Sequence, residues 1–144
     1  MITATANPHL SFNGTCEAAF NFYKSVFGGE FTELYRYKDT PGQEIPASEK
    51  EKIMHISLRL TEHVCLMGGD TSEMFGPPAQ VGTNVTLTIC PANDEETRRL
   101  YDALSAGGTI TMPLENTFWA DLYAAFTDKF GTCWALNFMK DGCQ

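Results

Sequence analysis

The chain has 144 residues, a formal net charge of −8 at pH 7 and a hydrophobic fraction of 43%. This length and apolar content fit one compact domain. The acidic balance argues against a nucleic-acid partner, because the 10 Lys and Arg residues are spread thinly and form no basic stripe. The start of the sequence has no signal-peptide pattern, and no stretch approaches the roughly 20 apolar residues that span a bilayer. We therefore expect a cytoplasmic protein without a membrane partner.

The cysteines are odd in number and widely spaced, and no C-x-x-C pair suggests a zinc knuckle or a redox centre. They are Cys16, Cys65, Cys90, Cys133 and Cys143. We expect reduced and mostly buried thiols.

The first half of the chain predicts the order β-α-β-β-β. Thr15 is a candidate cap for a helix that has apolar residues at helical spacing, and the pair Gly28-Gly29 predicts its end. In the third strand, alternation places Met54 and Ile56 on one face and His55 on the other. The predicted strands cover residues 9–12, 30–38, 53–60 and 64–69.

The same order of signals returns after a Gly- and Pro-rich segment. Asn93 and Glu96 resemble a capping box at the start of a second helix, and Gly107-Gly108 predicts its end. The predicted strands of this half cover residues 84–90, 109–114, 121–128 and 132–138. A duplicated module is the economical interpretation: one domain, 1–144, contains module 1 (8–70) and module 2 (83–140), joined by a linker (71–82).

Several motifs carry a family resemblance: His-Leu-Ser-Phe-Asn-Gly at 9–14, Phe-Gly-Gly at 27–29, Thr-Phe-Trp-Ala at 117–120 and Thr-Asp-Lys-Phe-Gly at 127–131. The sequence resembles the PhnB-like branch of the vicinal-oxygen-chelate superfamily, which includes glyoxalase I, bleomycin-resistance proteins and extradiol dioxygenases. The resemblance implies an α+β fold in which two βαβββ modules form a U-shaped mixed sheet around a concave cavity. The helices are then on the outer face, and a homodimer commonly completes the assembly.

The resemblance also assigns faces to the first strand of each module. The residues expected to face the helices are Leu10, Phe12, Val85, Leu87 and Ile89. Those expected on the concave side are His9, Ser11, Asn84, Thr86 and Thr88.

Relatives with chemistry hold a divalent metal through His or Glu side chains on the first and last strands of each module. The positions transferred to this chain are His9, Asn84, Met67 and Ala135. Only His9 is an ordinary ligand for such a metal. We therefore expect no metal and no other cofactor. If a metal is bound, His9 is the expected ligand, and a remodelled site that adds Asn137, Cys65 or His55 stays open.

Other candidates have two interpretations each. Arg36, Lys38 and Arg59 fit either an anionic ligand or a solvated strand edge. Phe118-Trp119 fits the mouth of an apolar pocket, but also core packing or a dimer seam. The segment 74–77 fits a flap over the cavity or a subunit contact.

These observations favour a small-molecule-binding protein of the glyoxalase/bleomycin-resistance type that lacks the usual metal site. The expected ligand-binding residues are His9, Ser11, His55, Met67, Asn84, Phe118 and Trp119. No catalytic residue can be named, and no fingerprint for a methyl-transfer cofactor is present. The alternatives are a metal-dependent lyase, isomerase or dioxygenase with a remodelled metal site, and an interaction module whose dimer surface matters more than its cavity.

Overall fold

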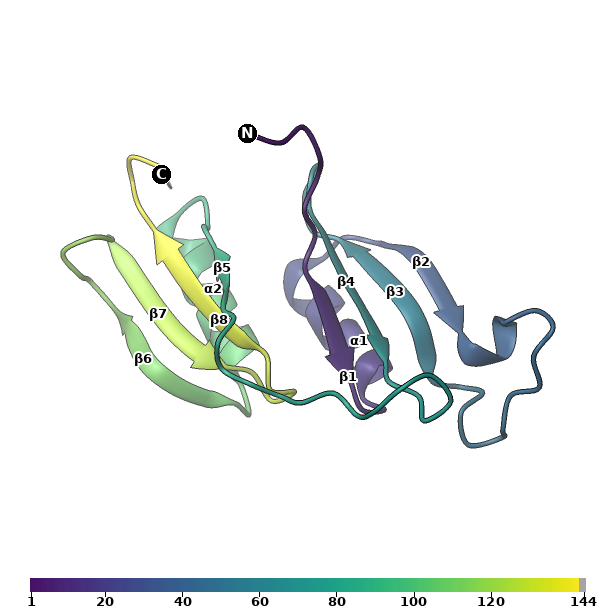
Figure 1. The fold of residues 1–144 in the computed structure, drawn as a ribbon. Coiled ribbons are helices and arrows are strands. Elements are labelled where there is room, and N and C mark those ends of the chain that lie inside the picture. Colours follow the sequence, from purple (N-terminus) through teal and green to yellow (C-terminus); the bar gives the residue numbers. More distant parts are fainter. Residues whose placement is uncertain (143–144) are drawn as a thin grey trace. The chain divides into compact units, whose positions relative to one another are not determined.

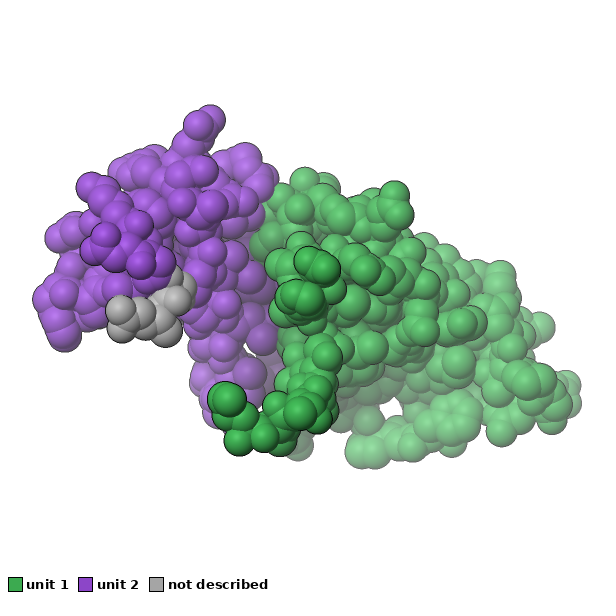
Figure 2. All heavy atoms as spheres, turned by 90° about the horizontal axis from the view of Figure 1, so that it is seen from above, with its two compact units in different colours: residues 1–80 green, residues 81–144 purple. Residues whose placement is uncertain are grey.

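The computed structural model describes residues 1–142. The chain divides into two compact units, residues 1–80 and 81–144 (Figure 2). Each unit contains a four-stranded mixed sheet and one α-helix that packs against one face of that sheet (Figure 1). The predicted α+β class and the repeated βαβββ order are confirmed.

The first unit contains a mixed sheet with the strand order β1-β4-β3-β2. Strand β1 is parallel to β4, and the other neighbouring strands are antiparallel. The elements are β1 (His9–Phe12), α1 (Cys16–Phe27), β2 (Phe31–Arg36), the 3-10 turn η1 (Tyr37–Asp39), β3 (Ile53–Arg59) and β4 (Cys65–Asp70).

Helix α1 covers one face of the first sheet. Phe20 points from the helix toward the sheet and meets the Phe12 ring edge-on, with 6.3 Å between ring centroids. Gly68 leaves the space for this contact, since a Cβ atom there would lie 2.5 Å from the Phe20 ring. Phe12 and Gly68 therefore mark the face that points toward the helix, and the opposite face of this sheet is not covered by α1.

The start of α1 is held by a residue distant in sequence. Thr15 occupies the N-cap position, but its side chain makes no capping hydrogen bond. Instead, Oδ1 of the buried Asp70 accepts hydrogen bonds from the backbone N–H groups of Gly14 (2.9 Å) and Cys16 (3.0 Å). The other oxygen, Oδ2, accepts from the N–H of Ile53 at 2.9 Å. The predicted Thr15 cap is therefore wrong, because the buried Asp70 carboxylate, and not the Thr15 hydroxyl, accepts the free N–H of Cys16 at the first position of the helix.

The predicted alternation in β3 fails at its first two residues. Ile53 is fully buried and Met54 is 37% exposed, so Met54 does not share the buried face with Ile56. The pairing of β2 with β3 shifts register between Tyr35 and Arg36, next to this point. Such an irregularity breaks the strict period of two that the prediction assumed.

The second unit repeats the topology with the order β5-β8-β7-β6, and β5 is again the parallel strand. Helix α2 packs against β6, β7 and β8. The elements are β5 (Leu87–Ile89), α2 (Asp94–Ser105), β6 (Thr109–Glu115), β7 (Leu122–Thr127) and β8 (Cys133–Phe138).

The start of α2 follows the sequence prediction closely. Oδ1 of Asn93 accepts a hydrogen bond from the N–H of Glu96 at 2.8 Å, and the Glu96 carboxylate reaches back to the N–H of Ala92 at 3.0 Å. This is a capping arrangement in which the carboxylate binds one residue earlier than in the standard box. Val85 is 65% exposed and precedes the short strand β5, so its predicted position toward the helix is wrong.

The thiols differ from the prediction in two ways. Cys16 is buried, whereas Cys65 and Cys133 are only partly buried, and these three are free. Cys90 takes part in a disulfide, so the expectation of a reduced thiol is wrong for this residue. Cys143 lies outside the described residues. Within residues 1–142, no helix has the length and apolar character needed to cross a membrane.

Candidate functional site

The uncovered face of the first sheet gathers polar side chains from all four strands. His9 on β1 is paired with Met67 on β4, and Met67 is paired with Ser57 on β3. These residues alternate with Leu10, Gly68 and Ile56, which belong to the helix-covered side. Ser11 lies two residues after His9 on β1, so it shares the same face, and it is exposed. The structure thus places four predicted ligand-binding residues, His9, Ser11, His55 and Met67, on one face.

The two histidines of this face are in contact. The rings of His9 and His55 stack with centroids 6.1 Å apart and planes 24° from parallel. Nε2 of His55 lies 2.9 Å from Oε2 of Glu33 on the neighbouring strand β2. Partial burial lowers the pKa of His9 below its ordinary value of 6.5, and the nearby His55 lowers it further. His9 is therefore mainly neutral at pH 7.

Glu33 is a site residue that the sequence reading missed. It lies opposite Ser57 in the β2–β3 pairing, and Tyr35 lies opposite His55. Alternation along β2 was visible in the sequence, but the partner of each residue depends on a register that shifts twice within this strand pair. The sequence signal that could have revealed Glu33 is an acidic residue in the strand that precedes the His55 strand.

The uncovered face of the second sheet is aromatic instead. The Trp119 ring meets the Phe118 ring edge-on at 4.8 Å and the Tyr123 ring edge-on at 5.3 Å between centroids. Phe118 is 97% exposed and Trp119 is 40% exposed. Large rings at this exposure mark a surface suited to binding an apolar group. Core packing is thereby excluded for Phe118 within the described part of the chain.

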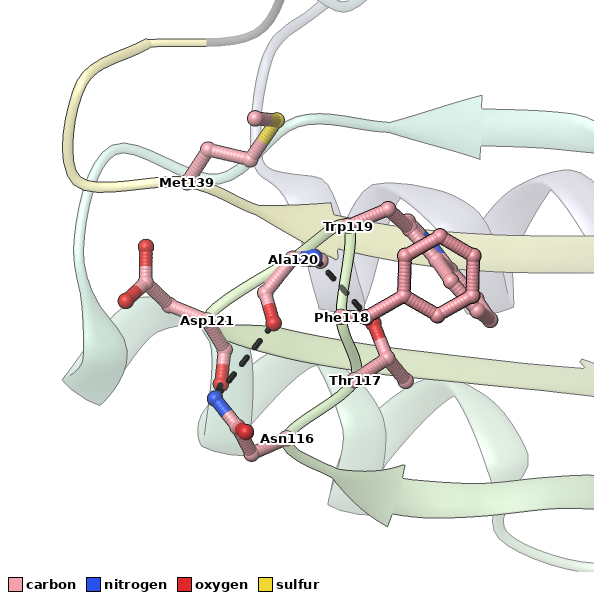
Figure 3. Close-up of a pocket in the computed structure, with 7 residues that line it drawn as sticks. All are labelled: Asn116, Thr117, Phe118, Trp119, Ala120, Asp121 and Met139. Atoms are coloured by element: carbon pink, nitrogen blue, oxygen red, sulfur yellow. Dashed lines mark hydrogen bonds between the residues drawn. The ribbon is translucent and has the colours of Figure 1, made fainter.

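Hydrogen bonds fix the loop between β6 and β7 that carries these rings (Figure 3). Nδ2 of Asn116 donates to the carbonyl of Asp121 at 3.1 Å, and the N–H of Ala120 donates to Oγ1 of Thr117 at 3.1 Å. The loop and Met139 enclose a shallow cavity of about 220 Å³. Figure 3 shows the Phe118 and Trp119 rings together on one side of the loop, with the Asp121 carboxylate on the other.

Strand pairing corrects one transferred metal position. Cys65 and Cys133 each begin the last strand of their module, so Met67 and Ala135 are equivalent third residues. Met67 pairs with His9, and Ala135 pairs with Thr88. The residue equivalent to His9 is therefore Thr88. Asn84, transferred to this position from sequence, precedes β5 and is exposed.

The corrected donor set does not fit a divalent metal of the kind used by the superfamily. It offers one imidazole, one thioether, one hydroxyl and one methyl group, on His9, Met67, Thr88 and Ala135. Such ions need three or more nitrogen, oxygen or thiolate ligands from the protein in most catalytic sites. In the part of the chain that the structure describes, no group of three His, Cys, Asp or Glu side chains is arranged to hold a metal ion.

The basic candidates Arg36, at the end of β2, and Lys38, in η1, have carboxylate partners. Arg36 makes two hydrogen bonds to the Glu17 carboxylate, at 2.7 and 2.9 Å, and Lys38 binds Glu51 at 2.8 Å. The hydrogen bonds from Arg36 hold the pKa of Glu17 below its ordinary range. This network favours the strand-edge interpretation for Arg36 and Lys38 over an anion clamp. Arg59 is exposed on the same face as His55.

The segment 74–77 lies within the first unit. Phe75 stacks on Tyr37 with 5.8 Å between ring centroids, and both line a cavity of about 280 Å³. Asn13 holds the chain after this segment: its Nδ2 donates to the carbonyl of Ala79, and its Oδ1 accepts from the N–H of Ala79. The chain at Ala79 is thus attached to the turn that follows β1.

Comparison with known proteins identifies the family. The model of the 3-demethylubiquinone-9 3-methyltransferase family matches residues 4–137, which is most of the chain. The chain belongs to this family. Protein YjdN of Escherichia coli K12 is 29% identical over 143 residues, covering 93% of this chain and 95% of YjdN.

Solved structures agree with this PhnB-like assignment. Protein PA1353 from Pseudomonas aeruginosa is 34% identical with a TM-score of 0.84, over 95% of this chain and 98% of that one. The putative 3-demethylubiquinone-9 3-methyltransferase PhnB protein from Bacillus cereus is 24% identical with a TM-score of 0.70, over 94% and 99%. A glyoxylase/bleomycin resistance protein/dioxygenase domain from Frankia sp. EAN1pec shares the fold at 11% identity and a TM-score of 0.67, over 99% and 96%. The predicted resemblance to the PhnB-like branch is confirmed.

Proposed function

We infer that this PhnB-like protein binds a small, partly aromatic molecule through the uncovered faces of its sheets and that it does so without the metal of its superfamily. The observation that carries the proposal is the contrast between the two faces. One gathers imidazole, carboxylate and hydroxyl groups, whereas the other presents the Phe118, Trp119 and Tyr123 rings. Directed polar groups and apolar rings are both usual components of small-molecule sites.

Methyl transfer, which the family description names, is not part of this proposal. A fold does not fix an activity, and a function has to be argued from the residues of the site. The residues on these faces supply hydrogen-bonding and stacking groups, whereas a methyl-donor fingerprint is absent from the sequence.

The test exploits the two tryptophans of the chain. Trp119 is partly exposed, whereas Trp134 is 1% exposed and donates its Nε1–H to Asp128 at 2.8 Å. We expect compounds from a panel of small aromatic molecules to raise the melting temperature and to quench the fluorescence of Trp119. Both effects should disappear in Trp119→Ala and persist in Phe75→Ala, which removes another exposed ring.

The metal-dependent alternative is examined in parallel. Elemental analysis of the purified protein, with thermal shifts in Mg, Mn, Fe, Co, Ni, Cu and Zn ions, should give less than one metal per chain and no marked stabilisation. A stoichiometric metal that is lost in His9→Ala would instead support the lyase, isomerase or dioxygenase reading. Binding that is unchanged in Trp119→Ala would remove the aromatic face from the proposal.

We also propose that the protein forms a homodimer. Large apolar side chains on the second unit support this, because solvent-exposed side chains of this size mark contact surfaces. They are Val81, Val85, Ile110, Met112 and Phe118. Sedimentation equilibrium should give twice the chain mass, and Val85→Asp together with Ile110→Asp should reduce it; a monomer at micromolar concentration would contradict the proposal.

A further inference from the structure

The first unit contains a cavity of about 280 Å³, and none of the residues that line it lies in a strand of the sheet. The Tyr37 and Phe75 rings stack at one side of it with planes 16° from parallel, and Phe75 is 58% exposed. Part of the Phe75 ring is therefore free to contact a bound molecule. The walls come from η1 and from the connection that follows β4, and they are Tyr37, Thr71, Ser72, Phe75, Gly76 and Pro77.

The walls of this cavity offer hydrogen-bond acceptors more than donors. The Tyr37 hydroxyl donates to the carbonyl of Asp70 at 2.7 Å, and the Thr71 hydroxyl donates to Oδ1 of Asn13 at 2.8 Å. Both hydroxyl oxygens can still accept a hydrogen bond. The wall N–H groups that already bond to carbonyls of the chain are those of Thr71, Phe75 and Gly76. The cavity is therefore suited to a ligand that donates hydrogen bonds.

A buried carboxylate with an unused oxygen lies beside the Ser72 wall. Glu49 is 7% exposed, and its Oε1 accepts a hydrogen bond from Nζ of Lys52 at 2.7 Å. Its Oε2 has no hydrogen-bond partner within residues 1–142. Lys52, and after it the nearby Ser72 hydroxyl, hold the pKa of Glu49 below its ordinary range, which places Ser72 next to this carboxylate. A buried acceptor without a partner costs free energy, so a donor from a ligand is favoured here.

Negative charge is in excess around the cavity. The hydrogen bond to Glu49 raises the pKa of Lys52, and the charges of Asp70 and Glu73 act in the same direction. Burial raises the pKa of Tyr37, and the charges of Asp70 and Glu49 add to this effect. Three carboxylates thus act on this region, and the Lys52 ammonium opposes them. Such a field attracts a cation, and so do the faces of aromatic rings.

We propose that this cavity is a second binding site, which takes a small protonated amine. The ammonium N–H groups bind on the Ser72 and Glu49 side, and the aliphatic part contacts the Phe75 ring. The volume lies just below the range of about 300–1,000 Å³ that is usual for drug-sized ligands, which fits an amine of a few carbon atoms. The site belongs to the first unit and does not depend on the function proposed above.

A purely structural role is the competing explanation. In that case the Ser72 hydroxyl or a buried water satisfies Oε2 of Glu49, and Phe75 stacks on Tyr37 only to hold the connection in place. The two explanations differ in one measurable property. A cation site distinguishes an ammonium group from a neutral hydroxyl group on the same carbon chain, whereas a structural cavity does not.

The experiment therefore compares n-butylammonium with 1-butanol, which has the same carbon chain and no charge. Titration of the full chain with n-butylammonium at pH 7, followed by amide NMR, should give saturable shifts for residues 71–76. Binding of 1-butanol should be at least about tenfold weaker, a factor that corresponds to about 1.4 kcal/mol. Because the probe is aliphatic, the indole N–H signal of Trp119 on the aromatic face should stay in place.

Two variants test the charge and the ring. Glu49→Gln keeps an acceptor for Lys52 but removes the buried charge, so it should weaken n-butylammonium binding about tenfold. Glu51→Gln is the matched control, because it removes a charge from the same loop at a side chain that is 70% exposed. Phe75→Ala should weaken binding about two- to fivefold, the usual effect of an exposed ring on a cation. Amide spectra show whether each variant is folded.

The cation site is overturned if n-butylammonium and 1-butanol bind with equal affinity, or if no amide signal of residues 71–76 shows saturable shifts. It is also overturned if Glu49→Gln and Glu51→Gln weaken binding equally, since a distant surface charge then has the same effect as the buried one. The comparison of the two probes uses the unaltered chain, so it decides the question even if Glu49→Gln does not fold.

Discussion

Replacing Asp70 with Asn should destabilise the first unit by about 3 kcal/mol, although the substitution is nearly isosteric. The carboxylate is buried at the end of β4 and accepts three backbone N–H groups, from Gly14, Cys16 and Ile53. It therefore joins the turn after β1, the first turn of α1 and the start of β3. The strand that carries His55 begins at one of these contacts.

The magnitude follows from the hydrogen bonds that Asn cannot make. Its side chain has one acceptor oxygen and one NH2 group, so in either orientation the NH2 faces at least one backbone N–H. If the amide oxygen takes the place of Oδ1, the N–H groups of Gly14 and Cys16 keep a hydrogen bond, but to a neutral acceptor. The N–H of Ile53 then faces the NH2 group and is left unsatisfied. Hydrogen bonds to charged groups contribute about 1.5–3 kcal/mol, and a buried unsatisfied donor costs about 1–3 kcal/mol.

Urea unfolding followed by circular dichroism gives the change in free energy, and hydrogen exchange of α1 locates it. Fluorescence is unsuitable here because both tryptophans, Trp119 and Trp134, lie in the second unit. Asp39→Asn is the matched control, since exposed Asp39 accepts one backbone hydrogen bond, from Arg36, that Asn can also accept. A loss below about 0.5 kcal/mol in Asp70→Asn, or equal losses in the two variants, would refute the reasoning.

Three smaller predictions follow from the same structure. Trp134→Phe removes the Nε1–H donor of buried Asp128 and should cost about 2 kcal/mol in urea unfolding, whereas an unchanged midpoint would count against that contact. Asn93→Ala removes the α2 cap and should cost about 1 kcal/mol by thermal unfolding, with Ser restoring most of it. NMR titration should give His9 a pKa below its ordinary value of 6.5. The unfolded chain then binds this proton more strongly than the folded one, so the free energy of unfolding should fall as the pH drops from 6.5 toward the lower pKa. The fall should be smaller in His9→Gln.

The fold was predictable because its signals are local and occur twice. Gly28 has a φ of 76° at the end of α1 and Gly107 has a φ of 75° after α2, a backbone conformation that glycine adopts at little cost. The Asn93 cap was likewise visible from residues three positions apart. Asp70, which holds the start of α1, was not predictable, because its partners are 54 and 56 residues away in sequence.

The site was predictable only as far as side chains could be assigned to faces. His9, His55 and Met67 alternate with apolar residues, so their common face could be inferred without knowing which strands are neighbours. Glu33 could not be found this way, because its place beside His55 depends on a pairing register. Thr88 was expected on the concave side, but its equivalence to His9 also depends on the register. The shared cavity between the modules stays a prediction.

Pairing register also shows how the two modules have diverged on their uncovered faces. Met67 and Ala135 are equivalent positions, and they pair with Ser57 on β3 and with Ala125 on β7. Two residues earlier on these strands lie His55 and Tyr123, which are therefore equivalent as well. His55 contacts a carboxylate and a second imidazole, whereas Tyr123 contacts the Trp119 ring. One strand position therefore serves hydrogen bonding in the first module and ring packing in the second.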